Sequence, residues 1–275
     1  MVTLDSIYYE EGCAIGVLPT QGWSVDGVFC LNPDVATDRW DYMKSQFMGQ
    51  SEDFPYVRIK GPRYEKSVLE HTLGPEGNDG NPRGIAGCAI NTANCCLGHL
   101  RALNQAYTMG CNTAFILEDD MILNKNLQEE LNACVKELNE TDPEWIFCHF
   151  ANPEHPDQTF AIKTRYSENL SNGYGMWGAG AILYSKRGLD IFKEYGKEGV
   201  QPYDLHTYHH PEGTYSWKLA HSRENQVVLY FPLREDGSEI KEFIYPSLRN
   251  DGFPGLVSED MVSAFYEEYN GFDKS

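Results

Sequence analysis

Three consecutive acidic residues, Glu118, Asp119 and Asp120, are the part of the sequence best suited to chemistry. Apolar residues flank them on both sides, at 114–117 and 121–123. Buried carboxylates repel one another and lose their hydration, so such a cluster is costly unless a cation compensates it. Glu118 and Asp120 point to the same side of an extended chain, where their oxygen atoms suit one hard divalent ion. The pattern therefore predicts a metal site, and the alternative is a solvated acidic turn.

Alternating strands and helices are expected to position this acidic motif. Short apolar runs bounded by Gly, Pro and Asn predict strands, and apolar residues three or four apart predict helices. Up to residue 150 the predicted strands are 28–31, 56–59, 113–117 and 144–150, and the predicted helices are 38–47, 92–109 and 126–138. This order is typical of an α/β domain with a largely parallel sheet. The acidic motif then lies at the carboxyl end of a strand, where open α/β sheets bind ligands.

The second half of the chain has a less regular pattern. It predicts a strand within 173–184, helices at 185–195, 215–220 and 260–269, and a strand at 226–233. Thr92 or Asn94 is expected to cap the helix 92–109, and Gly110 to end it. Residues 74–87 are rich in Gly and Pro and predict a long loop of the kind that serves as a lid or binding loop.

Charge and composition exclude several classes of protein. The 275 residues include 22 Lys and Arg against 41 Asp and Glu, which gives a net charge of −19. Proteins that bind nucleic acid or anionic lipid need clustered basic residues, so neither class fits. With 41% hydrophobic residues, the chain can also bury a core, which argues against disorder.

The eight cysteines lie mostly in apolar segments, which favours buried, reduced thiols over disulfides. The sequence has no Cys-x-x-Cys pair and no His-Glu-x-x-His pattern, so we do not expect a zinc site. Residues 1–18 lack a basic stretch followed by an apolar core, and no run approaches the roughly 18 apolar residues of a membrane helix. We therefore expect a cytoplasmic protein.

Several motifs, taken in order, resemble glycosyltransferase family 25, the lipopolysaccharide-type and collagen-type sugar transferases. The resemblance includes Ile-Leu-Glu-Asp-Asp at 116–120 and Cys-Cys-Leu-Gly-His-Leu at 95–100, where Gly98 replaces the family's Ser. It also includes the apolar strand and Asn at 28–32, Asp-Arg-Trp at 38–40, the Gly-rich apolar stretch 178–185, and Pro-Tyr-Asp at 202–204. Together these motifs cover about residues 27–235.

This resemblance implies a GT-A-like single domain over residues 1–275, with a mixed, mostly parallel central sheet flanked by helices. The nucleotide-binding half would be about 1–125 and the acceptor-side half about 126–275. Glu118 and Asp120 would hold Mn²⁺ or Mg²⁺, with His209 as a third ligand. The nucleotide sugar would contact Leu31, Asn32, Arg39, His99 and Glu118, and the catalytic residues would be Asp119 and Asp204, the latter as general base.

Four of these residues have open alternatives. Asp204 is either the general base or a loop residue that caps a turn, and His209 is either a metal ligand or part of a polar loop. Arg39 either approaches the diphosphate or base, or is a surface charge on a helix. His99 either contacts the metal site or is a core histidine with satisfied hydrogen bonds.

The implied function is metal-dependent transfer of a sugar from a nucleotide diphosphate sugar, expected to be UDP-linked, to a hydroxyl of a glycan or glycoprotein. The family resemblance implies inversion at the sugar and a role in surface glycan synthesis. A nucleotidyltransferase or phosphatase that uses the same acids is one alternative. A non-catalytic domain that binds carbohydrate or nucleotide sugar is another.

Overall fold

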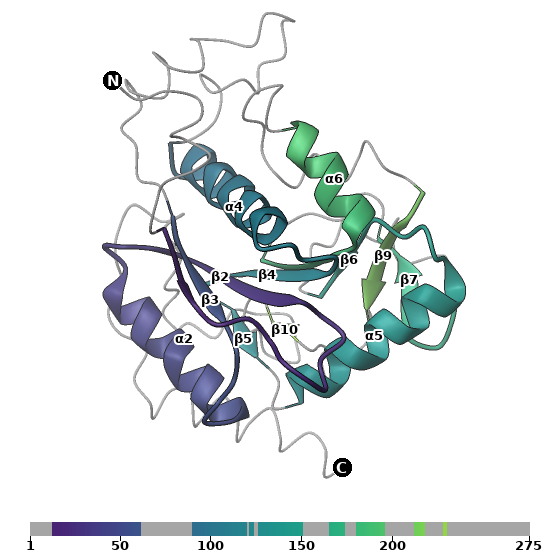
Figure 1. The fold of residues 1–275 in the computed structure, drawn as a ribbon, viewed down its shortest axis with the longest axis horizontal. Helices are drawn as coiled ribbons and strands as arrows, with labels where there is room; N and C mark the ends of the chain where they lie inside the picture. The colour runs from purple at the N-terminus through teal and green to yellow at the C-terminus, as the bar shows by residue number, and fades with distance from the viewer. Residues whose placement is uncertain are drawn as a thin grey trace, which may run out of the picture.

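The computed structural model describes residues 13–61, 90–119, 121–123, 126–150, 165–173, 180–195, 212–217 and 228–229. These residues form an α/β structure around a mixed eight-stranded sheet with helices on both faces (Figure 1). The strands of this sheet are β1 (Ala14–Gly16), β2 (Gly27–Pro33), β3 (Val57–Gly61), β4 (Ala114–Glu118), β6 (Phe147–His149), β7 (Leu170–Asn172), β8 (Ala181–Tyr184) and β9 (Thr214–Trp217). A separate pair, β5 (Ile122–Leu123) and β10 (Val228–Leu229), is antiparallel. The α/β class and mixed sheet predicted from the sequence are confirmed, but the expectation that the sheet is mostly parallel is wrong. Of its seven neighbouring pairs among the described strands, three are parallel and four antiparallel, because β1, β7 and β8 each run against their neighbours.

The order of strands in the main sheet is β1-β3-β2-β4-β8-β6-β9-β7. Parallel pairs join β2 to both β3 and β4, and β6 to β9, while the other neighbours pair antiparallel. The chain leaves β2 toward β3 and leaves β4 toward the opposite side of the sheet, where β6 lies. Strands β2 and β4 therefore form a topological switch point, and their carboxyl ends are where a doubly wound sheet binds a ligand.

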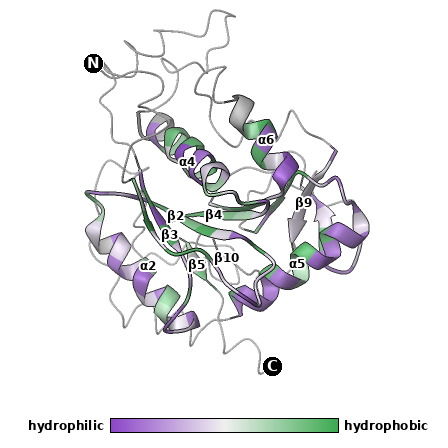
Figure 2. Ribbon diagram, viewed as in Figure 1, coloured by the Kyte–Doolittle hydropathy of each residue, from purple (hydrophilic) through white to green (hydrophobic). Residues whose placement is uncertain are grey.

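The described helices cover the two faces of the sheet. Figure 1 shows α4 (Ile90–Thr108) and α6 (Lys186–Tyr195) over one face, and α2 (Thr37–Gln50) and α5 (Leu127–Thr141) over the other. Figure 2 shows hydrophobic central strands, with hydrophilic residues over much of α2 and α5. Burial of the apolar strand residues on both faces therefore holds the layers together.

Side-chain alternation divides the core into two clusters. Phe115 and Leu117 of β4 pack on the α2 and α5 side, whereas Ala114 and Ile116 pack on the α4 and α6 side. Because successive strand residues point to opposite faces, Glu118 continues the α4 side. The acidic motif is thus divided between the two faces of the sheet.

Most element predictions agree with the structure, but the helix predicted at 215–220 is wrong. Its first residues belong to β9, which lies between β6 and β7 in the sheet. The segment Thr-Tyr-Ser-Trp alternates polar and aromatic residues with the period of two that suits a strand. All four residues are buried, since the strand is covered on both faces.

The boundaries of α4 correct one prediction and confirm another. The helix begins at Ile90, so the predicted caps Thr92 and Asn94 lie inside it. Gly110 ends the helix with a φ of 77°, as predicted. The Gly110 N–H donates to the carbonyl of Tyr107, and the next N–H donates to that of Ala106, which satisfies carbonyls at the helix end.

The predicted loop 74–87 and helix 260–269 lie outside the described residues. In the described parts of the chain, no helix combines the length and apolar character needed to cross a membrane. Seven of the cysteines fall in those parts, and they are free thiols.

Candidate functional site

The candidate site lies at the carboxyl ends of β2 and β4. Leu31 of β2 is in register with Glu118 of β4, so Asn32 and Asp119 follow at the same edge. The Glu118 N–H donates to the Gly180 carbonyl at 2.8 Å, which fixes the end of β4 against the residue preceding β8. The ends of these two neighbouring strands therefore bring together Leu31, Asn32 and Glu118, which were predicted to bind ligand or metal, and Asp119, which was predicted to be catalytic.

Asp119 points toward α2 and is enclosed there. Its Oδ1 forms an ion pair with Arg39 NH1 at 2.8 Å, and its Oδ2 accepts a hydrogen bond from Asn32 Nδ2. Only 5% of the Asp119 side chain is exposed. Burial raises the pKa of this carboxyl to about 6, although Arg39 and Asn32 act in the opposite direction. Both oxygen atoms are already engaged, so Asp119 is better placed to fix Arg39 than to bind a cation.

Arg39 lies in the first turn of α2 and is buried, which makes the surface-charge interpretation wrong. One of its three guanidinium nitrogens holds Asp119. The other two, Nε and NH2, are buried and have no hydrogen-bond partner among the described residues. A buried donor without a partner costs free energy, so these two nitrogens are a feature that the fold of the described residues does not itself stabilise.

A second arginine, Arg58 of β3, extends this polar region. Its NH2 donates to the side-chain carbonyl of Asn32 and forms an ion pair with Asp34 at 3.5 Å. Its guanidinium also lies 4.8 Å from the centre of the Trp40 ring, a cation–π contact. Lys60 forms an ion pair with Asp34 at 3.6 Å. Cations therefore gather at this edge in a protein that is acidic as a whole.

The sequence interpretation missed Arg58 and Lys60. The sequence of β3, Val-Arg-Ile-Lys, alternates apolar and basic residues, and this alternation could have revealed them. The apolar residues face α4, so the basic residues face the other side of the sheet.

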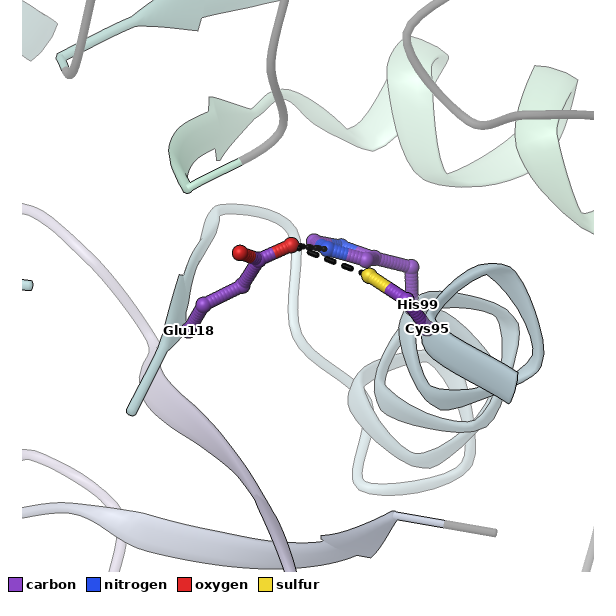
Figure 3. A group of neighbouring side chains, drawn as sticks. All are labelled: Cys95, His99 and Glu118. Carbon is purple, nitrogen blue, oxygen red and sulfur yellow. Dashed lines mark hydrogen bonds and ion pairs between the residues drawn. The ribbon is translucent and has the colours of Figure 1, made fainter. Parts of the chain in front are cut away.

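Glu118 lies on the opposite face of the sheet, against α4. Its Oε1 is 3.1 Å from Cys95 Sγ and 3.1 Å from His99 Nε2 (Figure 3). Cys95 and His99 are four residues apart, so both side chains project from the same side of the helix. His99 is fully buried, whereas 12% of the Glu118 side chain is exposed. His99 thus contacts Glu118 directly, and its predicted role at the nucleotide sugar or metal site stays a prediction.

Gln46 of α2 fixes the segment that follows the acidic motif. Its side-chain amide donates to the Met121 carbonyl at 2.8 Å and accepts from the Leu123 N–H at 2.8 Å. Gln46 is buried, so these two bonds satisfy backbone groups that have no access to water. Nothing in its local sequence distinguishes it from a surface residue of an amphipathic helix, and the sequence interpretation missed it.

His149, at the carboxyl end of β6, is another residue that sequence reasoning missed. It is buried, and neither ring nitrogen has a hydrogen-bond partner among the described residues. Burial lowers its pKa to about 4, so the ring is neutral in the folded protein at neutral pH.

Of the remaining predicted site residues, the structure describes only Leu31. Leu31 packs into the apolar cluster on the α4 side and is 6% exposed. Asp120, Asp204 and His209 lie outside the described residues, so their roles stay predictions. Among the described residues the site fits Mn²⁺ or Mg²⁺ only in part. Glu118 offers the oxygen that these ions prefer, but its neighbours offer sulfur and nitrogen.

Comparisons with known proteins do not establish a family. No family model matches the chain, and no curated protein sequence matches it significantly. Membership of glycosyltransferase family 25 therefore stays a prediction.

The solved structures with detectable similarity include glycosyltransferases. The galactosyltransferase LgtC with donor and acceptor sugar analogues is 12% identical, with 89% of this chain and 95% of that one covered and a TM-score of 0.39. An active-site mutant of LgtC is 14% identical, with 90% and 95% covered and a TM-score of 0.42. Mouse xyloside xylosyltransferase 1 without ligand is 12% identical, with 78% and 76% covered and a TM-score of 0.34. Scores this low do not establish a shared fold.

Proposed function

We propose that this protein is a metal-dependent glycosyltransferase of GT-A-like fold. It would transfer a sugar from a UDP-linked or similar nucleotide diphosphate donor to a hydroxyl of a glycan or glycoprotein, with inversion at the sugar carbon. The proposal combines the ordered motif resemblance with the geometry of the strand ends. It assigns the protein to surface glycan synthesis.

The observation that carries the proposal is the buried Asn32–Asp119–Arg39 arrangement at the ends of β2 and β4. It fixes a guanidinium at the switch point, with two nitrogens that lack partners among the described residues. A nucleotide diphosphate carries several negative oxygens and carbonyl acceptors, which match such donors. Because the protein is acidic as a whole, it repels an anionic donor substrate. A fixed cation at the carboxyl ends of β2 and β4 would offset this repulsion.

The residues divide the task as follows. Arg39 contacts the diphosphate or the base, while Asp119 and Asn32 hold the guanidinium in place. Glu118, with Asp120 as its predicted partner, binds the cation, and a bound divalent ion would neutralise the departing diphosphate. Asp204 would accept the proton of the attacking hydroxyl.

The direct test is turnover of a panel of nucleotide sugars with Mn²⁺ or Mg²⁺, followed by mass spectrometry of the nucleotide product. Free nucleoside diphosphate supports sugar transfer or donor hydrolysis. Release of sugar 1-phosphate, with the nucleoside monophosphate transferred to an acceptor or to water, would indicate a nucleotidyltransferase instead. Binding of a sugar nucleotide without turnover would indicate a non-catalytic binding domain.

Three variants test the roles assigned to individual residues. Asp120→Ala removes the predicted metal ligand, and Arg39→Gln removes the guanidinium. Both should reduce turnover by at least about 100-fold, the size typical of losing one charged group that stabilises a transition state. Arg187→Gln is the control, because Arg187 is half-exposed on α6 and contacts Glu144 rather than the strand ends. If Asp120→Ala and Arg39→Gln retain full metal-dependent turnover, the assignment of both residues fails.

A further inference from the structure

We infer that Cys95, His99 and Glu118 form a binding site for a single transition-metal ion of the Zn²⁺ and Co²⁺ type. The site shares Glu118 with the proposed function but does not depend on sugar transfer. It also differs in chemistry from the Mn²⁺ or Mg²⁺ site expected from the sequence, because two of its three ligand atoms are not oxygen.

The first support is the convergence of three ligand atoms. Cys95 Sγ, His99 Nε2 and a Glu118 carboxylate oxygen all lie within 4.8 Å of one another. The contacts of Cys95 Sγ and His99 Nε2 with Glu118 Oε1 are each 3.1 Å. Tetrahedral zinc with bonds of about 2.0–2.3 Å places its ligand atoms about 3.3–3.8 Å apart. To admit an ion, the two contacts to Glu118 would widen by a few tenths of an ångström. The separation of Cys95 Sγ from His99 Nε2, at most 4.8 Å, would close by up to about 1 Å.

The second support is the rigidity of the elements that present these ligands. Cys95 and His99 come from successive turns of α4, whose buried face packs against the sheet. Glu118 ends β4, a strand with hydrogen-bonded neighbours on both sides. As Figure 3 shows, the helix side chains point toward the glutamate from across the gap between α4 and β4. A site built on a helix and a central strand is preorganised, so little entropy is lost when the ion binds.

The third support is the kind of ligand. A thiolate, an imidazole and a carboxylate favour Zn²⁺ or Co²⁺ over the hard ions Mg²⁺ and Ca²⁺. Three protein ligands leave a fourth position for water or substrate, which is the pattern of catalytic rather than structural zinc sites. Cys95 and Glu118 are both partly exposed, so an ion can enter from solvent.

Sequence patterns did not reveal this site because its ligands do not form one of the familiar motifs. Cys95 and His99 have helical spacing, but the third ligand follows 19 residues after His99, beyond the end of α4. Only the packing of α4 on β4 brings it close.

The test uses Co²⁺ as a spectroscopic substitute for Zn²⁺ on the full chain, stripped of metal and kept reduced with a phosphine. One Co²⁺ per chain should produce visible bands of tetrahedral geometry and a near-ultraviolet thiolate-to-cobalt charge-transfer band. Cys95→Ser should abolish the charge-transfer band, and Zn²⁺ should displace Co²⁺ from the wild type. Cys96→Ala is the matched control, because Cys96 is the adjacent cysteine and is buried in the core on the sheet side of α4. It should retain the band.

The inference is overturned if no charge-transfer band develops, if Cys95→Ser retains it, or if Cys96→Ala loses it. A second measurement on the wild type covers the case in which Cys95→Ser does not fold. Zn²⁺ should slow iodoacetamide alkylation of Cys95, read for each cysteine by mass spectrometry, and unchanged alkylation would refute the site. Neither measurement uses a sugar nucleotide, so failure of the proposed function would leave these outcomes unaffected.

Discussion

The buried ion pair between Arg39 and Asp119 permits a quantitative prediction about what holds the strand ends together. The perturbation is a double-mutant cycle of Asp119→Asn, Arg39→Met and the combined variant. Asparagine keeps the volume of the aspartate but can satisfy only one of its two partners, because its amide nitrogen is a donor and so are Arg39 and Asn32. Arg39→Met removes the guanidinium while keeping most of the aliphatic volume.

The expected magnitude follows from the burial of the pair. The exposed fractions of the two side chains are 7% and 5%. Removing one partner of such a pair leaves an uncompensated buried charge, which costs about 3–5 kcal/mol of stability. Removing both avoids this penalty, so the combined variant should lose less than the sum of the single variants. We expect a coupling energy of about 2–3 kcal/mol, at the upper end for residues in contact.

The assay is urea unfolding at pH 8, where a carboxyl with a pKa of about 6 is ionised. Unfolding is followed by tryptophan fluorescence and circular dichroism, which should give the same transition. Linear extrapolation then gives the free energy of unfolding of the wild type, the two single variants and the double variant. The control cycle is Lys186→Met and Asp190→Asn on α6, an ion pair whose side chains are 45% and 51% exposed. Its coupling should be at most about 0.5 kcal/mol, because solvent screens the charges.

Additive losses at Arg39 and Asp119 would refute the reasoning, as would a loss below about 1 kcal/mol for Asp119→Asn. Either outcome would mean that the pair does not hold the strand ends together. A coupling equal to that of the α6 control would have the same meaning.

Four further substitutions have outcomes fixed by the local structure. Gln46→Met should cost about 2–4 kcal/mol in urea unfolding, because it removes the side-chain hydrogen bonds to two buried backbone groups, the Met121 carbonyl and the Leu123 N–H. His149 has a folded pKa of about 4 against an ordinary 6.5, so the unfolded chain binds a proton in that window while the fold does not. Protonation of His149 in the unfolded chain should therefore lower the free energy of unfolding by about 3 kcal/mol as the pH falls from 6.5 to 4. The pH dependence of unfolding should therefore be flatter in His149→Phe by that amount, and an identical dependence would contradict the burial. Gly188→Ala should destabilise the protein strongly, since the added Cβ would lie 2.2 Å from the Ile146 carbonyl oxygen. The Cβ added by Gly49→Ala meets no atom within 4 Å, so this variant should stabilise α2 by up to about 1 kcal/mol in a thermal melt.

The sequence by itself determined the class of the fold and the position of its acidic motif. Apolar periodicity located β2, β4, α4 and α5 closely, because burial on one stripe or two faces leaves a direct trace in the residue pattern. It failed at β9, where the last three of its four residues were assigned to a helix. Their state is decided by pairing with β6 and β7, which are distant in sequence.

Tertiary structure decided which residues surround each acid. The sequence treated Glu118 and Asp119 as members of one cluster, but strand alternation sends them to opposite faces of the sheet. One therefore meets Cys95 and His99 on α4, and the other meets Arg39 on α2. These partners depend on which helix packs on which face, and that arrangement is set by the strand order rather than by any local pattern of residues.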